Sequence, residues 1–164
     1  MYPMQDIDDS FFIDAKFRFI AKVELNCNPQ RLFEIFEDAH AWTIWAGPIQ
    51  KVEWTSPKPF GIGTTRTVFM QGGLEGYEEF IAWDRGKHMA FKFIGSNKDN
   101  MQAFGEDYKV EDLGNNRCAL TWVMAMEPKG FSRVMLSLIK PIMATLVQGM
   151  ANKLAKYVDK NPNI

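Results

Sequence analysis

The feature that most constrains this chain is an amphipathic stretch at its C-terminal end, from Phe131 to Asp159. Its apolar residues recur at every third or fourth position, the period that gathers side chains on one face of an α-helix. They are Phe131, Val134, Met135, Leu138, Ile142, Leu146, Met150, Leu154, Tyr157 and Val158. At 1.5 Å per residue this helix would be about 42 Å long, so it must lie across most of a small domain. We therefore predict one long helix with a broad partner.

The opposite face of this helix is polar and is expected to face water; it carries Arg133, Ser137, Lys140, Gln148, Asn152, Lys153 and Lys156. Pro141 cannot donate a hydrogen bond to the carbonyl of Ser137, which predicts a kink or a break between residues 137 and 141. Ile139, Met143 and Val147 widen the apolar face. A face of this width suits packing against a sheet and equally suits the roof of a ligand cavity.

Composition excludes several classes of protein. The chain has 164 residues and a formal net charge of -1, which argues against a dedicated nucleic-acid binder, because such proteins carry a basic excess. The two cysteines, Cys27 and Cys118, indicate free thiols in a reducing compartment. The acidic start of the chain lacks the pattern of a signal peptide, and no uninterrupted apolar run is long enough to cross a bilayer. We expect a soluble, cytoplasmic protein, and homo-oligomers are compatible with this sequence.

The remaining residues predict strands joined by tight turns. Residues 1–16 form a polar lead-in, and Phe17 to Leu25 alternates apolar and polar residues like a half-buried strand. Asn28-Pro29 starts a short helix that ends near Asp38, and a second runs from His40 to Ala46. Six further strands are expected over residues 49–55, 64–71, 74–83, 87–94, 102–111 and 117–127, with Gly, Asn and Asp in the turns. Residues 17–160 then form a single α+β domain with a helix-grip fold, in which an antiparallel sheet of about seven strands curls around the long helix.

At this level the chain resembles the START-like superfamily, also called Bet v 1-like or SRPBCC, the polyketide cyclase/dehydrase and lipid transport group. The resemblance covers about residues 17–160. It rests on the element order and on five local patterns: Asn28-Pro29, Trp42-Thr-Ile-Trp45 before Gly47-Pro48-Ile49, Gly61-Ile-Gly63, the segment from Tyr77 to Asp84, and the long final helix. It implies an apolar ligand held between sheet and helix. These patterns specify a fold rather than an activity, and no catalytic motif of one subfamily is matched.

Glu106 is the best single candidate for a polar group in such a cavity. It shares one strand face with Phe104, Tyr108 and Val110, and burial in an apolar wall would push its pKa upward, as a general acid or base near neutral pH requires. The alternative is that Glu106 lies at the rim or pairs with Arg66 or Arg117. We expect no cofactor. Metal binding is also not expected, because the histidines and cysteines lack ligand spacing.

Three interpretations of function remain open. The first is a binding or transport protein for a small hydrophobic molecule such as a lipid, an isoprenoid or quinone, or an aromatic polyketide-like compound. The predicted cavity lining is Trp42, Trp45, Phe91, Phe104, Tyr108, Trp122, Met124, Leu138, Ile142, Met143 and Leu146. The second is an enzyme of the cyclase/dehydratase type, in which Glu106 or Tyr108 transfers protons. The third is an interaction module with a filled core, which the size of the internal void distinguishes from the other two.

Overall fold

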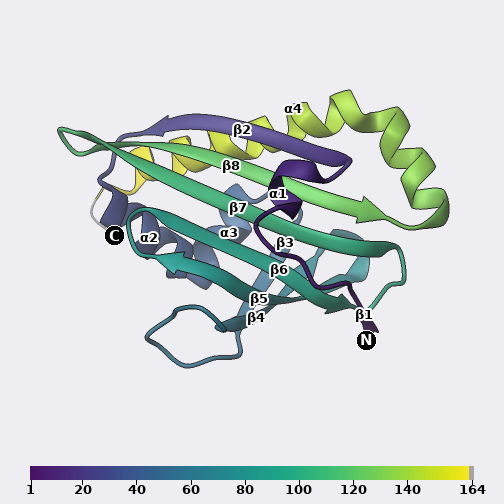
Figure 1. Cartoon of the computed structure of the whole chain (residues 1–164). Helices are drawn as coiled ribbons and strands as arrows, with labels where there is room; N and C mark the ends of the chain where they lie inside the picture. Colours follow the sequence, from purple (N-terminus) through teal and green to yellow (C-terminus); the bar gives the residue numbers. More distant parts are fainter. Residues whose placement is uncertain (163–164) are drawn as a thin grey trace.

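The structure is a computed structural model that describes residues 1–162 (Figure 1). In chain order its elements are β1 (Tyr2–Pro3), α1 (Phe11–Asp14), β2 (Phe17–Leu25), α2 (Pro29–Glu37), α3 (Ala39–Trp45), β3 (Ile49–Trp54), β4 (Thr65–Met70), the short 3-10 helix η1 (Gln71–Gly73), β5 (Leu74–Asp84), β6 (His88–Ser96), β7 (Met101–Gly114), β8 (Arg117–Pro128) and α4 (Gly130–Lys160). This is the predicted α+β helix-grip fold, and the predicted helices and main strands agree with it to within a few residues.

The fold is built around one curved antiparallel sheet. Its strands follow the order β2-β8-β7-β6-β5-β4-β3, so each hairpin from β3 to β8 joins neighbours, and β2 closes the far edge beside β8. The tight turns have the backbone that their residues favour: Gly72 and Gly73 have positive φ between β4 and β5, and Asn115 and Asn116 have positive φ between β7 and β8. The concave face of the sheet is rich in aromatic side chains and forms most of the core.

The long helix α4 lies along the edge strand β2 more than across the middle of the sheet. Gln148 fixes this docking, because its side chain accepts from the backbone N–H of Lys22 at 3.2 Å and donates to the Lys22 carbonyl at 3.0 Å. Near the C-terminal end of α4, the side-chain amide of Asn26 donates to the carboxylate of Asp159 at 2.8 Å. These contacts cover backbone groups of an edge strand that would otherwise be free to pair with another chain.

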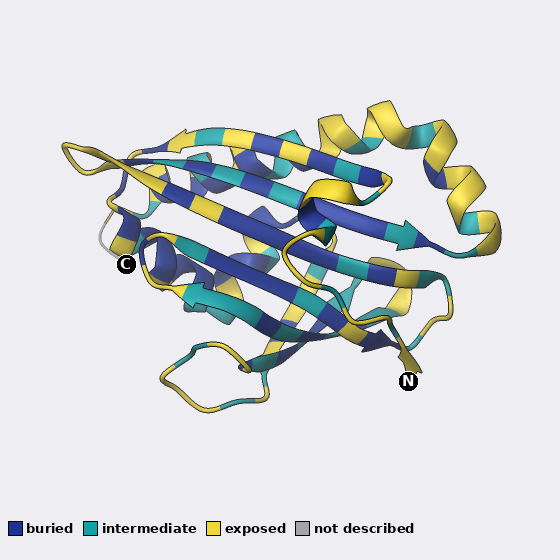
Figure 2. Cartoon of the chain, viewed as in Figure 1, coloured by how far each residue is buried: buried dark blue, intermediate teal, exposed yellow. Residues whose placement is uncertain are grey.

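In the N-terminal half of α4 the buried face is not the face that the sequence predicted. Phe131, Leu138 and Ile142 are 77%, 73% and 59% exposed. In the N-terminal half the residues that turn inward belong to the neighbouring stripe; they are Leu136, Ile139, Met143 and Val147. In the C-terminal half Leu154, Tyr157 and Val158 of the predicted stripe are buried, together with Ala151. Figure 2 shows the N-terminal turns of α4, which are mainly exposed, arching beyond the edge of the sheet. The helix bends in the region that Pro141 was expected to disturb, but it continues without a break.

By length and composition alone, α4 is the one helix among residues 1–162 that could span a membrane, and only 17% of its most apolar window is buried. Polar residues such as Arg133, Lys140 and Gln148 interrupt this helix, so the sequence has no uninterrupted apolar run of that length. A single helix of this kind is weak evidence, because helices of soluble domains meet the same criterion. Here the C-terminal half of α4 is packed within the domain through Leu154 and Val158.

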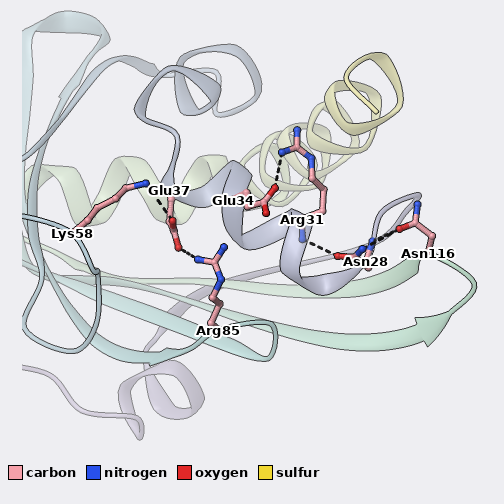
Figure 3. A network of polar contacts seen from close by, with 7 residues as sticks. All are labelled: Asn28, Arg31, Glu34, Glu37, Lys58, Arg85 and Asn116. Atoms are coloured by element: carbon pink, nitrogen blue, oxygen red, sulfur yellow. Dashed lines mark hydrogen bonds and ion pairs between the residues drawn. The ribbon is translucent and has the colours of Figure 1, made fainter. Parts of the chain in front are cut away.

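The short helices α2 and α3 close one end of the curved sheet. Asn28 caps α2 by accepting from the N–H of Arg31 at 2.9 Å, as the Asn-Pro pair predicted. Polar contacts then tie α2 to distant loops (Figure 3): Asn28 also donates through its backbone N–H to Asn116 at 3.1 Å, and Glu37 pairs with both Lys58 and Arg85. Trp42 of α3 is held in place by its indole N–H, which donates to the Phe36 carbonyl at 2.7 Å.

The first sixteen residues lie on the convex face of the sheet (Figure 1). Tyr2 and Pro3 pair with the end of β6, beyond the point at which β6 pairs with β7. Phe12 of α1 is buried against Ala90 and Ala125, away from the main core. The segment that was expected to be a lead-in therefore covers part of the outer surface of the sheet, and its Met4 packs against the main core.

Cys27 and Cys118 are both free and buried, and they lie next to each other. A thiol–thiol hydrogen bond lowers the pKa of Cys27 and, together with burial, raises that of Cys118. Their sequence separation had given no sign of this contact.

Candidate functional site

A cavity of about 630 Å³ lies between the concave face of the sheet and α4. Its walls come from α3 and the loop after it, from the start of β3, from strands β4 to β8, and from the middle of α4. Apolar side chains dominate these walls, and they include Phe91, Phe93, Met124 and Met126 of the sheet and Met143 and Met150 of the helix. The interior of the domain is therefore not filled, and this space is in the range of pockets that hold drug-sized molecules.

The cavity opens to solvent between α4 and the loop that joins α3 to β3. The lining residues that are exposed mark this rim; they are Pro48, Gln71, Thr145, Leu146 and Lys153. Lys153 is the one cationic side chain of the rim. Gly149 lies beside them on α4, and a Cβ added at that position would meet no atom within 4 Å. The rim therefore has free space on its helical side.

A cluster of polar side chains is buried in the cavity wall; it consists of Arg66, Glu78, Glu106, Tyr108 and Trp122, and we call it the polar cluster. Arg66 of β4 and Glu78 of β5 are direct cross-strand partners. The Nε of Arg66 donates to Oε2 of Glu78, and both side chains are almost fully buried, at 0% and 2% exposed. Burial raises the pKa of Glu78, and the charge of Arg66 opposes that shift.

The guanidinium of Arg66 is surrounded by aromatic rings. Its Cζ lies 4.1 Å from the centroid of a Trp42 ring and 4.8 Å from that of Phe91. Trp54 and Phe80 lie slightly farther away, at 5.3 and 5.1 Å. Stacking against aromatic faces stabilises a desolvated cation and fixes the plane of the guanidinium.

Glu106 of β7 is 7% exposed and faces the cavity, as its strand phase predicted. Its Oε2 accepts from the Tyr108 hydroxyl and from the indole N–H of Trp122, the latter at 3.2 Å. Burial raises the pKa of Glu106 from 4.5 to about 8; the hydrogen bond from Tyr108 opposes this shift, and the charge of Glu78 adds to it. Burial and the neighbouring carboxyl likewise raise the pKa of Tyr108. Glu106 is therefore mainly protonated at neutral pH.

Neither ion pair considered for Glu106 in the sequence analysis forms. Arg66 pairs with Glu78, and Arg117 pairs with Glu24 on the outer surface. The indole N–H of Trp122 donates to Glu106.

The structure brings together eight of the eleven residues predicted to line a cavity. Trp42, Phe91, Phe104, Tyr108, Trp122, Met124, Met143 and Leu146 lie at its wall. Three lie elsewhere. Trp45 is buried behind the wall, with its ring 4.7 Å from that of Trp42 and 5.9 Å from that of Trp122. Leu138 and Ile142 are exposed, because α4 presents the neighbouring stripe to the sheet.

Arg66 and Glu78 were not predicted as site residues, although the sequence holds a signal for them. Arg66 is in phase with Val68 on its strand, and Glu78 is in phase with Phe80 on the next. A hairpin centred on Gly72 pairs residues whose numbers sum to 144, which sets 66 opposite 78. Two opposite charges on the apolar faces of paired strands are the pattern of a buried ion pair.

Fold and cavity together define a helix-grip protein that encloses an apolar cavity with a polar cluster in its wall. Residues 16–159 match the family described as polyketide cyclase/dehydrase and lipid transport, and the chain belongs to that family. An uncharacterized protein of Mycobacterium tuberculosis is 41% identical over 159 residues, which cover 97% of this chain and 95% of that protein. The resemblance to the START-like superfamily inferred from element order is thus confirmed.

Solved structures with the same fold are more distant in sequence. A START superfamily protein from Mycobacterium smegmatis aligns with a TM-score of 0.71 at 12% identity, covering 87% of this chain and 97% of that one. An aromatase/cyclase from a Streptomyces species aligns with a TM-score of 0.69 at 11% identity, covering 89% and 95%. At these identities the similarity shows the fold and leaves the ligand to be argued from this chain's own residues.

Proposed function

We propose that this protein binds a small hydrophobic molecule in the cavity between the sheet and α4, with a lipid, an isoprenoid or quinone, or an aromatic polyketide-like compound as the candidate classes. One observation carries the proposal: about 630 Å³ of mainly apolar space opens at a rim and contains a buried polar cluster. Apolar walls provide affinity through the hydrophobic effect, and a few fixed polar groups orient the ligand.

Tryptophan fluorescence provides the test, because Trp42 and Trp122 line the cavity. Titration with a panel of fatty acids, prenyl quinones and aromatic polyketones should quench this emission saturably at micromolar concentration. Native mass spectrometry of protein purified from its host should show a bound mass. No quenching by any panel member and no bound mass would refute the proposal.

A variant that fills the rim provides the control. Gly149→Phe places a ring beside the cavity without a clash at Cβ, and it also removes a helix-weakening glycine. Binding should fall at least tenfold while the thermal stability of the fold is kept. Ala144→Phe adds the same ring at an exposed position of α4 outside the cavity and should leave binding unchanged.

A second candidate function is proton transfer on a bound carbonyl compound, and the environment of Glu106 favours it. A carboxyl group whose pKa is about 8 can act as an acid or a base near neutral pH, and Tyr108 and Trp122 hold it in place by donating to one oxygen. The test is deuterium exchange next to the carbonyl of an aryl methyl ketone. Exchange should be faster with the protein than in buffer, and Glu106→Gln should abolish that acceleration while the ketone still binds. Equal exchange in both proteins would exclude the enzymatic role for Glu106.

A further inference from the structure

The buried arginine of the polar cluster has donors that no residue uses. Nε of Arg66 donates to Glu78, but Nη1 and Nη2 are buried and have no hydrogen-bond partner among residues 1–162. These two nitrogens carry four N–H bonds. Leaving buried donors unpaired costs about 1–3 kcal/mol each, so a ligand that supplies acceptors gains that free energy on binding.

The guanidinium is fixed before any ligand arrives. The ion pair with Glu78 holds its Nε edge, and the rings of Trp42 and Phe91 pack within 5 Å of its Cζ. A planar fork that is already oriented loses little conformational entropy on binding. The unpaired Nη atoms are therefore an oriented pair of donors that suits a planar group with two acceptor oxygens, which reaches them when a side chain of the enclosing wall moves aside.

Glu106 adds a further donor to this arrangement. Both hydrogen bonds from Tyr108 and Trp122 end on its Oε2, and Oε1 makes no hydrogen bond within the described part of the chain. In the protonated acid the hydrogen belongs on Oε1, because Oε2 is already an acceptor twice. Arg66 and Glu106 together thus present donors, and the group that they recognise must accept.

The charges around the cavity favour an anion over a neutral acceptor. Among the lining residues that the structure describes, Arg66 and Lys153 are cations, and Glu78 is the one carboxylate that remains when Glu106 is protonated. With Arg66 and Lys153 charged, Glu106 protonated and Glu78 ionised in its pair with Arg66, the wall carries a net charge of about +1 at neutral pH. A single negative charge on the ligand neutralises it, and a charge-assisted bidentate contact satisfies donors that are already desolvated and unpaired.

We propose that the ligand is an apolar molecule that ends in a carboxylate, which Arg66 binds through Nη1 and Nη2. This inference rests on the proposed binding function and specifies its ligand class. The carboxylate matches the guanidinium fork in shape, number of acceptors and charge, and the apolar remainder occupies the space lined by phenylalanine and methionine.

Two matched series of probes test this proposal with the unaltered protein. One consists of pyrenebutyric acid, its methyl ester and pyrenebutanol; the other consists of palmitic acid, methyl palmitate and hexadecanol. At pH 6.5 each acid should bind at least about tenfold more tightly than its ester and its alcohol, as loss of a charge-assisted bidentate contact implies. Equal binding within each series would overturn the carboxylate assignment and leave the binding function intact. If neither series binds and no member of the wider panel of fatty acids, prenyl quinones and polyketones binds, both the carboxylate assignment and the proposed binding function are refuted.

A double variant then assigns the preference to Arg66. Arg66→Met combined with Glu78→Gln removes both members of the buried pair, so neither charge is left alone in the core. This variant should bind the ester as the parent does and should lose the preference for the acid, with an acid-to-ester ratio near one. Retained ester binding shows that the cavity has folded.

The matched control is Arg117→Met combined with Glu24→Gln, an exposed ion pair between the neighbouring strands β8 and β2. It should keep the full preference for the acid. If the Arg66 variant also keeps that preference, the anion is bound by another group and the assignment to Arg66 is wrong. If the Arg66 variant does not fold, the two probe series with the unaltered protein decide the carboxylate assignment.

Discussion

The buried carboxyl of Glu106 should make the stability of this protein depend on pH in an unusual direction. Its pKa is about 8 in the folded chain and returns toward 4.5 on unfolding. Between these values the folded state holds a proton that the unfolded state releases, so the free energy of unfolding falls as pH rises. With 1.36 kcal/mol per pKa unit, linkage predicts a loss of about 4 kcal/mol between pH 5 and pH 8.5.

Glu106→Gln isolates this contribution, because its amide is neutral at every pH and has nearly the same shape. At pH 5 its stability should lie within about 1 kcal/mol of the parent, and at pH 8.5 it should be the more stable protein by several kcal/mol. Urea unfolding followed by tryptophan fluorescence at pH 5, 6, 7 and 8.5 measures the difference. Glu111→Gln, at an exposed position of the same strand, is the control and should parallel the parent. A constant difference between the Glu106 variant and the parent over this range would refute the assignment of a protonated, buried carboxyl.

Three further outcomes are expected. Leu138→Ser should change the free energy of unfolding by no more than about 0.5 kcal/mol, because the Leu138 side chain faces solvent. Leu154→Ala should lower it by about 2–5 kcal/mol, because the Leu154 side chain is fully buried. Equal costs in a urea titration would contradict the orientation of α4. Arg66→Met alone should cost about 3–5 kcal/mol by leaving Glu78 unpaired, and adding Glu78→Gln should recover most of it, which a double-mutant cycle measures. The affinity for pyrenebutyric acid should fall as pH rises through about 8. Ionised Glu106 no longer donates a hydrogen bond, and it adds a negative charge near Arg66, Glu78 and the ligand. The same titration with Glu106→Gln should show no such fall.

The strands could be predicted from the sequence because each buries one face. Alternation from Phe17 to Leu25 and from Arg117 to Glu127 fixes which residues point inward, and a register slip would expose all of them. Glu106 was found as a candidate by the same reasoning, because its phase on a half-buried strand is set by its neighbours Phe104 and Tyr108.

The orientation of α4 could not be predicted in this way, because the helix is apolar on more than one side between residues 134 and 147. Leu138 and Ile142 form one stripe, and Ile139, Met143 and Val147 form the next. Hydrophobicity alone does not decide which of these two stripes packs against the sheet. The choice depends on contacts that only the folded chain supplies, above all the docking of Gln148 on the backbone of β2. The residues lost from the predicted cavity lining on α4 are those of the stripe that remained exposed.

The polar cluster itself indicates that this cavity is built for a ligand rather than for stability. Replacing a buried ion pair such as Arg66 and Glu78 by apolar residues of similar volume is often neutral or stabilising, and a carboxyl such as Glu106 costs free energy in any apolar wall. Unpaired Nη atoms on Arg66 add to this cost. A domain that needed only to fold would gain by filling the same space with leucine and phenylalanine. An interaction with a molecule outside the chain can offset the cost, and an acceptor group on that molecule is what these donors lack.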